Sequence, residues 1–201
     1  MRLCDEAPWG FGWVQEERMA RCSHALRAEG RVWLFDPVDG PGIDERIRAL
    51  GEPAGVIQLL DRHRRDCAAL AARLGVPHYV VPFQGVPGAP FDPTPVARHR
   101  LWREVALWWP EERVLLCGDA LGTVGYFVAP GEKLGVHPLL RLTPPKALGR
   151  FAPHHVLCGH GEGIHGEPAA PALEEALATA RRRLPAAVLS APRGSDREAS
   201  G

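Results

Sequence analysis

A short run of charged residues between an apolar segment and an alanine-rich segment constrains this chain more than any other feature. The apolar run 55–60 is continuous and rich in branched side chains, which is typical of a buried strand. Residues 66–74 carry apolar side chains at helical spacing, and the carboxylate of Asp66 suits the first turn of a helix. The pattern therefore predicts a strand, a loop over 61–67 and a helix. In open α/β folds, ligands bind at such loops, which follow the carboxyl ends of strands.

Length and charge limit the classes of protein to consider. The chain has 201 residues, of which 45% are hydrophobic, so it can bury one sizeable core, and we expect a single domain over 1–189. Residues 190–201 show no apolar pattern and are expected to form a frayed tail. Basic and acidic residues are balanced at 24 each, so no net field favours nucleic acid or an anionic membrane as a partner. Arginine supplies nearly all of the positive charge, which suggests a bacterial genome of high GC content.

The cysteines indicate a reducing compartment. There are five, an odd number, and they are widely spaced, which does not suit a disulfide framework: Cys4, Cys22, Cys67, Cys117 and Cys158. Three of the five lie in or beside apolar segments, where free cysteine behaves as a small apolar residue. The first residues contain no apolar signal region, and no run approaches the ~18 apolar residues of a membrane span. We therefore expect a cytoplasmic protein.

Further strands and helices are expected on both sides of the central loop. Apolar alternation or continuity predicts strands over 9–17, 19–26, 31–36, 75–82, 104–110, 113–119 and 154–161. Helical spacing predicts helices over 43–50, 134–150 (interrupted by prolines) and 171–184, and proline-rich residues 82–95 are expected to form a long loop.

Three short motifs stand at the ends of predicted strands: Asp36-Pro37, Gly118-Asp119 and His160-Gly161. Together with the central loop, they resemble the metallo-β-lactamase superfamily, whose signature is a strand, Thr-His-x-His-x-Asp-His and a helix. Asp66 matches the aspartate of that signature. The positions of the threonine, the first two histidines and the last histidine hold other residues: Asp61, Arg62, Arg64 and Cys67. The resemblance spans roughly 12–185 and implies an α+β fold, an αββα sandwich of two mixed sheets flanked by helices.

The departures from the signature bear on the metals that the resemblance implies. In this superfamily two zinc ions share a hydroxide, which metal coordination makes available as a nucleophile near neutral pH. The first zinc takes three neutral imidazoles, but Arg62 and Arg64 stand at two of these positions and have no lone pair to offer. His99 is the imidazole nearest the third position and lies out of register. A two-metal site is therefore not expected.

The second metal position of the superfamily keeps chemically acceptable ligands. Two carboxylates, a thiol and an imidazole would suit one zinc or iron ion: Asp66, Cys67, Asp119 and His160. The alternative is that no metal binds, and that Arg62 and Arg64 replace it through salt bridges to Asp66 and Asp119. Cys67, at a helix start beside arginines, is expected to have a lowered thiol pKa and to face the pocket.

Two further histidines are candidates. His63 occupies a variable position of the signature and is expected to face solvent, although it could replace a missing ligand, carry a proton or help to bind a substrate. His165, in a glycine-rich loop, could act as an acid or base, so the catalytic candidates are Asp66, Asp119 and His165.

Three functions from different classes remain open. The first is a protein with the metallo-β-lactamase fold and a degraded metal site, which lacks binuclear zinc hydrolase activity and binds a small anionic ligand through Arg62, Arg64 and His63. The second is a mononuclear metal-dependent hydrolase of an ester, thioester or lactone. The third is a non-catalytic partner-binding module. Whether the chain is an enzyme stays open at this level.

Overall fold

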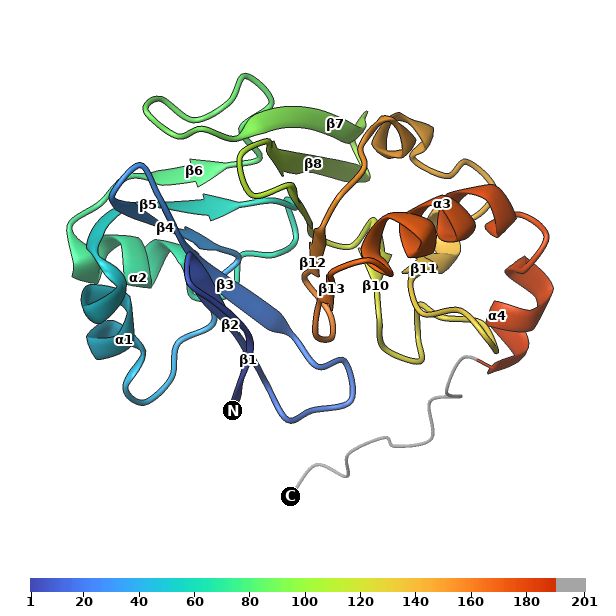
Figure 1. The fold of residues 1–201 in the computed structure, drawn as a ribbon, viewed down its shortest axis with the longest axis horizontal. Coiled ribbons are helices and arrows are strands. Elements are labelled where there is room, and N and C mark those ends of the chain that lie inside the picture. Colours follow the sequence, from blue (N-terminus) through green and yellow to red (C-terminus); the bar gives the residue numbers. More distant parts are fainter. Residues whose placement is uncertain (191–201) are drawn as a thin grey trace.

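The structure is a computed structural model that describes residues 1–190. Two β-sheets pack face to face, and helices lie on their outer faces (Figure 1). The expected tail at 190–201 lies outside these residues, except for Ser190. The arrangement is the α+β sandwich expected from the sequence, with mixed sheets and flanking helices. No helix in residues 1–190 has the length and apolar character needed to cross a membrane.

The first sheet has six strands in the order β1-β2-β3-β4-β5-β6. Strands β1 to β4 are antiparallel neighbours, whereas β4, β5 and β6 run parallel and are joined by helices α1 and α2. The bounds are β1 Arg2–Ala7, β2 Gly10–Val14, β3 Cys22–Ala28, β4 Arg31–Phe35, α1 Ile43–Leu50, β5 Glu52–Gln58, α2 Cys67–Leu74 and β6 His78–Val80.

The second sheet has five strands in the order β13-β12-β9-β8-β7, with β12 parallel to β9 and the other pairs antiparallel. A two-stranded sheet of β10 and β11 lies beside it. The bounds are β7 Asp92–His99, β8 Trp102–Trp109, β9 Val114–Cys117, β10 Leu121–Gly122, β11 Gly135–Val136, η1 Pro138–Leu140, η2 Lys146–Arg150, β12 His155–Cys158, β13 Ile164–His165, α3 Ala169–Thr179 and α4 Leu184–Ser190.

Three apolar layers hold the sandwich together. The outer layer on the first sheet packs α1 and α2 against strand residues such as Trp13 and Leu34. The layer between the sheets joins Phe35 and Ile57 to Leu116 and other buried residues of the second sheet. The third layer packs α3 and η2 on the outer face of the second sheet. Burial of these side chains, at roughly 25 cal/mol per Å² of apolar surface, is the main force that aligns the strand ends of the two sheets.

The expected strand, loop and helix around the charged run are present. β5 ends at Gln58, α2 begins at Cys67, and Leu60 makes a β-bridge with Glu104 of the second sheet. Asp66 stands at the N-cap position of α2, but its side chain does not cap the helix and accepts a hydrogen bond from Asp39 N at 2.8 Å. The carboxylate therefore fixes the loop after β4 instead of the helix start.

One strand was not predicted from the sequence, and one expected loop was wrong. Residues 2–7 form β1, although the sequence there shows no clear apolar alternation; its one fully buried residue is Cys4. β7 begins at Asp92, inside the segment expected to be loop, and contains Pro93 and Pro95. Proline is tolerated there because β7 lies at the edge of its sheet and pairs with β8 only, so its outward-facing positions need no N–H donor.

A buried ion pair fixes the segment between β10 and η1. Arg141 and Glu132 are fully buried, with Nη2 of Arg141 2.6 Å from Oε2 of Glu132. The same Nη2 donates to the carbonyl of Phe127 at 2.7 Å, and Glu132 accepts from Ala129 N at 2.7 Å. The guanidinium therefore holds Phe127, a ring that covers the site described below.

We expect Arg141→Met to lower the free energy of unfolding by about 3–5 kcal/mol, because it leaves the carboxylate of Glu132 buried without its partner. Urea denaturation followed by tryptophan fluorescence measures this loss. Arg181→Met, which removes an exposed guanidinium bonded to a carbonyl, is the matched control and should cost under about 1 kcal/mol. Equal losses in the two variants would show that the buried pair does not hold this segment.

Candidate metal centre

Four polar side chains follow four strands at the edge where both sheets end. Asp36 follows β4, His63 lies in the loop after β5, Asp119 follows β9 and His160 follows β12. β4 runs parallel to β5 and β9 runs parallel to β12, so their carboxyl ends meet at one edge of the sandwich. The backbone of Cys22, on β3, donates to Gly159 O at 2.9 Å and joins the two sheets at this edge.

Three of these side chains point at one another. Oδ1 of Asp119 lies 2.8 Å from Nε2 of His63 and 3.2 Å from Nε2 of His160. The three atoms all lie within 4.8 Å of one another, which is the spread of ligand atoms around one metal ion. His63 and His160 are buried, and Asp119 is partly buried.

The other nitrogen of each imidazole is already engaged. Nδ1 of His63 lies 2.7 Å from Oδ2 of Asp36, and Nδ1 of His160 lies 2.7 Å from the carbonyl oxygen of Met19. Both partners are acceptors, so each Nδ1 carries the proton and each Nε2 faces Asp119. Metal-binding histidines are held in this way, with the second ring nitrogen donating to a carboxylate or a backbone carbonyl.

Asp119 needs a positive charge beside it. Its Oδ1 lies close to both Nε2 atoms, yet neither contact has hydrogen-bond geometry, and the atom has no hydrogen-bond partner among the described residues. A lone pair on Nε2 facing a carboxylate oxygen at 2.8 Å would be repulsive. Either a cation between the three atoms or protons on the imidazoles must therefore be present.

The carboxylates set the protonation of His63. Burial alone would lower the pKa of His63, but the charges of Asp36 and Asp119 outweigh it and raise that pKa to about 9. Burial would likewise raise the pKa of Asp119, but contacts with His160 and His63 hold it well below its usual range. Without a metal ion, the centre is an imidazolium held between two carboxylates.

A buried carboxyl group that the sequence analysis missed lies beside Asp119. Glu104, on β8, is fully buried; its Oε1 accepts from Ala120 N at 2.8 Å and its Oε2 accepts from Trp102 Nε1 at 2.7 Å. Burial and the charge of Asp119 raise the pKa of Glu104 to about 7. The signal was present in the sequence, because Glu104 is an acidic residue that directly precedes the apolar run 105–109.

Solved structures with this architecture identify the fold. The chain is similar to the DIM-1 metallo-β-lactamase, with a TM-score of 0.60, 12% identity and coverage of 89% of this chain and 97% of that one. It is similar to TTHA1623 in a di-iron-bound form, with a TM-score of 0.56, 20% identity and coverage of 76% and 93%. The flavodiiron protein from Giardia intestinalis gives a TM-score of 0.57 at 12% identity, over 90% of this chain and 60% of that one.

The chain has the metallo-β-lactamase fold. This confirms the fold that the strand-end motifs implied. No protein-family model matches the sequence, and no curated protein matches it.

The expected position of His63 was wrong. It was expected to face solvent, but only 7% of it is exposed and it stands between two carboxylates. The loop is turned by Arg65, a residue with a left-handed backbone (φ 40°). Its guanidinium donates to three carbonyl oxygens at 2.6–2.8 Å and so pulls the loop into the sheet edge: Cys22, Asp36 and Gly159.

The arginines expected to replace a metal do not pair with the carboxylates. Arg62 donates to Leu101 O at 2.8 Å and lies over the ring of Trp102. Arg64 is exposed. Asp119 contacts imidazoles instead, so the expected salt bridges to Asp66 and Asp119 were wrong; a role of Arg62 and Arg64 in binding an anionic ligand stays a prediction.

Cys67 does not have the environment expected for a thiolate. It is fully buried in the apolar layer under α1 and α2, and its thiol donates to His63 O at 3.5 Å. Burial and the charge of Asp36 raise its pKa instead of lowering it, because an apolar environment disfavours the charged form. The expectation of a reactive thiolate that faces the pocket was wrong.

The other expected ligands lie apart from the cluster of His63, Asp119 and His160. Asp66 binds the backbone of Asp39, and His99 accepts from Leu101 N at the exposed end of β7. His165 contacts Asp5 at 2.7 Å. The structure therefore joins Asp119 and His160 with His63 and does not join them with Asp66, Cys67, His99 or His165.

The raised pKa of His63 predicts the pH dependence of stability in metal-free protein. The folded state holds the His63 proton more tightly than the unfolded state, whose imidazole pKa is near 6.5. This stabilisation is fully present below pH 6.5 and is lost as the pH rises through about 9, by on the order of 3 kcal/mol. Urea unfolding in chelator at several pH values measures it, and His63→Gln should flatten the curve in this window. A parent curve that is flat from pH 6.5 to 9 would contradict the prediction.

Proposed function

We propose that this chain binds one divalent metal ion through His63, Asp119 and His160, and that it acts as a mononuclear hydrolase of a small ester, thioester or lactone. The observation that supports this is the paired orientation of the imidazoles. Each presents Nε2 to the same carboxylate oxygen while its Nδ1 is anchored by an acceptor. Two imidazoles and one carboxylate form a common ligand set for zinc or iron, and they leave coordination positions open.

A bound ion in such a site supplies a hydroxide near neutral pH and polarises a carbonyl group. The residues of the chain would hold the site in place. Asp36 fixes the ring of His63, and its own Oδ1 accepts from Leu59 N at 2.8 Å. The ring of Phe127, fully buried, stacks on His160 at 5.6 Å between centroids and keeps water from that side.

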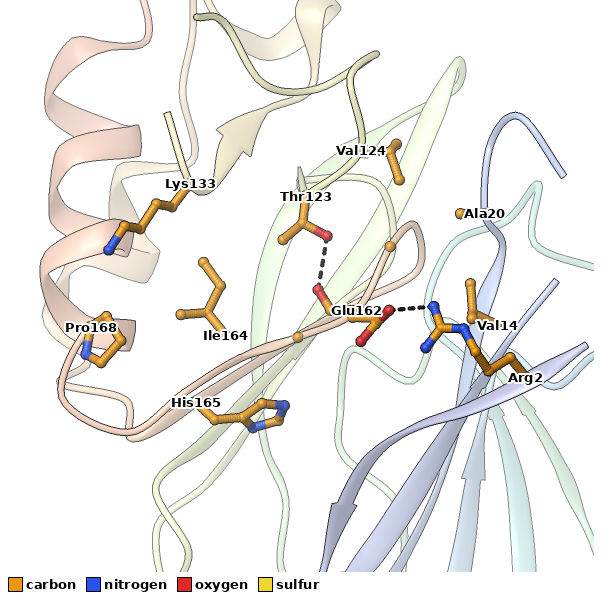
Figure 2. Close-up of a pocket in the computed structure, with 12 residues that line it drawn as sticks. Arg2, Val14, Ala20, Thr123, Val124, Lys133, Glu162, Ile164, His165 and Pro168 are labelled. Atoms are coloured by element: carbon orange, nitrogen blue, oxygen red, sulfur yellow. Dashed lines mark hydrogen bonds and ion pairs between the residues drawn. The ribbon is translucent and has the colours of Figure 1, made fainter. Parts of the chain in front are cut away.

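A cavity reaches Gly161, the residue after His160, but His63, Asp119 and His160 do not line it. Its volume is about 590 Å³, and it is lined by Thr123 and Val124, by Lys133, and by the residues that follow His160 (Figure 2). Arg2 also lines the cavity and is paired with Glu162. The positive charge of Lys133 supports binding of a substrate that carries an anionic group. The sequence analysis expected an anionic ligand too, but assigned its binding to Arg62 and Arg64.

One observation favours the alternative of a degraded, metal-free site. Because the pKa of His63 is raised to about 9, a proton on this ring already offsets one of the two negative charges of Asp36 and Asp119 near neutral pH. In that case the centre would be a structural ion pair, and any ligand would bind without hydrolysis. The metal content of the protein separates the two proposals.

We expect the double variant Asp119→Asn/His160→Gln to contain one equivalent of metal per chain less than the parent, when both proteins are made without a histidine tag. Asp36→Asn should weaken metal binding by about 10–100-fold, because it frees the ring of His63 without removing a ligand. Inductively coupled plasma mass spectrometry gives the stoichiometry. His99→Gln, which alters an exposed histidine, is the control and should retain the parent content. Equal content in the parent and the double variant would refute the proposed metal site.

Hydrolysis should depend on the same residues. With a panel of chromogenic esters, thioesters and lactones, Asp119→Asn should lower kcat/KM by at least about 100-fold, and His99→Gln should leave it unchanged. Chelation should abolish the activity, and added zinc or iron should restore it. A metal-loaded parent protein without activity on the whole panel would retain the metal site and reject the hydrolase.

A further inference from the structure

A second cluster of metal-binding side chains lies on the first sheet, away from the centre described above. Two thiols and a carboxylate, of Cys4, Cys22 and Asp5, present ligand atoms that all lie within 4.8 Å of one another. The buried imidazole of His24 lies beside two of them, Cys22 and Asp5. They face the second sheet, because His24 is in register with Phe35 of the layer between the sheets. Neither the fold nor the proposed hydrolysis accounts for this cluster.

The backbone is shaped to bring these side chains together. Cys4, Gly12 and His24 stand opposite one another on β1, β2 and β3, so their side-chain positions share one face. A bulge follows Cys4, and Asp5 adopts a left-handed backbone (φ 51°), which lets the adjacent residue reach the same face. Such a backbone is uncommon for a non-glycine residue, and aspartate is among the residues that adopt it most readily.

Gly12 leaves the space that the cluster occupies. A Cβ atom at this position would lie 3.0 Å from Cys4 Sγ, from Asp5 Oδ2 and from His24 Cδ2. Three members of the cluster therefore meet above a residue that has no side chain. Any larger residue would push them apart.

The distances among Cys4, Asp5 and Cys22, and from His24 to the last two, are close to those between the ligands of one ion. Sγ of Cys4 lies 3.5 Å from Sγ of Cys22, which lies 3.6 Å from Nε2 of His24. Oδ2 of Asp5 lies 3.5 and 3.9 Å from the two sulfur atoms and 3.1 Å from Nε2 of His24. Tetrahedral zinc with ordinary bond lengths separates its ligand atoms by about 3.4–3.8 Å. These five distances fall within about 0.4 Å of that range, and Cys4, Asp5 and Cys22 form the set whose three ligand atoms are mutually close.

A disulfide does not fit the same two cysteines. Cys4 and Cys22 stand on β1 and β3, with β2 between them. Two strand spacings of about 4.7 Å place their Cα atoms about 9 Å apart. A disulfide requires Cα atoms within about 7 Å of each other. An ion between the sulfur atoms bridges this gap without movement of the backbone.

We propose that Cys4, Cys22, His24 and Asp5 bind a structural zinc ion. The second oxygen of Asp5 supports this, since Oδ1 accepts from Gly163 N at 2.8 Å and contacts Nε2 of His165 at 2.7 Å. Ligand carboxylates are commonly held by such outer contacts. The ion would join β1 to β3, and Asp5 links both to Gly163 in the loop after β12. The proposal does not depend on hydrolysis or on metal at His63.

The test uses protein in which Asp119→Asn and His160→Gln remove the first site, so that any remaining ion is assigned to the second. This protein should retain one zinc per chain, and adding Cys4→Ser with Cys22→Ser should remove it. Cys117→Ser with Cys158→Ser is the matched control, because these buried thiols also lie close together, at 3.9 Å. Loss of zinc in the control as well, or retention in the Cys4 and Cys22 variant, overturns the proposal.

A spectroscopic measurement on the unmodified cysteines covers the case in which a variant fails to fold. Cobalt substituted into the protein without the first site should give intense visible bands of tetrahedral cobalt and a near-ultraviolet thiolate charge-transfer band. Alkylation should label Cys4 and Cys22 only after zinc is removed by chelation. Absence of the thiolate band, or a Cys4–Cys22 disulfide found by mass spectrometry in untreated protein, refutes the site.

Discussion

The contact between Asp36, His63 and Asp119 is the interaction on which this edge of the sandwich depends. Asp36 and His63 belong to the first sheet and Asp119 to the second, so the imidazole joins the two sheets through both of its nitrogens. Buried charges are tolerated only when they are paired, and each member of this set loses its partner if another is removed. The same ring that stabilises the sheet edge therefore orients the proposed metal ligands.

The fold was largely predictable because its cores leave strong periodic signals. The buried runs of β4, β5, β9 and β12 are apolar and end in polar motifs, and their order matched the architecture that the structure confirms. β1 gave no such signal, since its inward residues are Cys4 and Asp5, which pack around an unusual backbone instead of an apolar layer. Local pattern shows where apolar surface is buried, and it does not show where polar groups are buried together.

The site was predictable only in part, for the same reason. Asp119 and His160 follow strands directly, so the strand ends fix their positions. His63 lies in the middle of a loop, and its direction depends on the guanidinium of Arg65, which binds backbone carbonyls of three distant segments. The comparison of this loop with the metallo-β-lactamase signature drew attention to Arg62 and Arg64 and overlooked Arg65. Contacts to backbone carbonyls carry no side-chain pattern, so the sequence alone could not reveal them.

Charge balance explains how this centre can exist with or without a metal ion. Two carboxylates, Asp36 and Asp119, are held at a buried edge beside the imidazoles of His63 and His160. One divalent ion with two neutral rings leaves the set neutral, whereas the proton on His63 without an ion leaves one negative charge. The exchange of an ion for this proton requires no new side chain. Metal binding at this edge is therefore a competition with protons, and the surrounding fold can remain the same in both states.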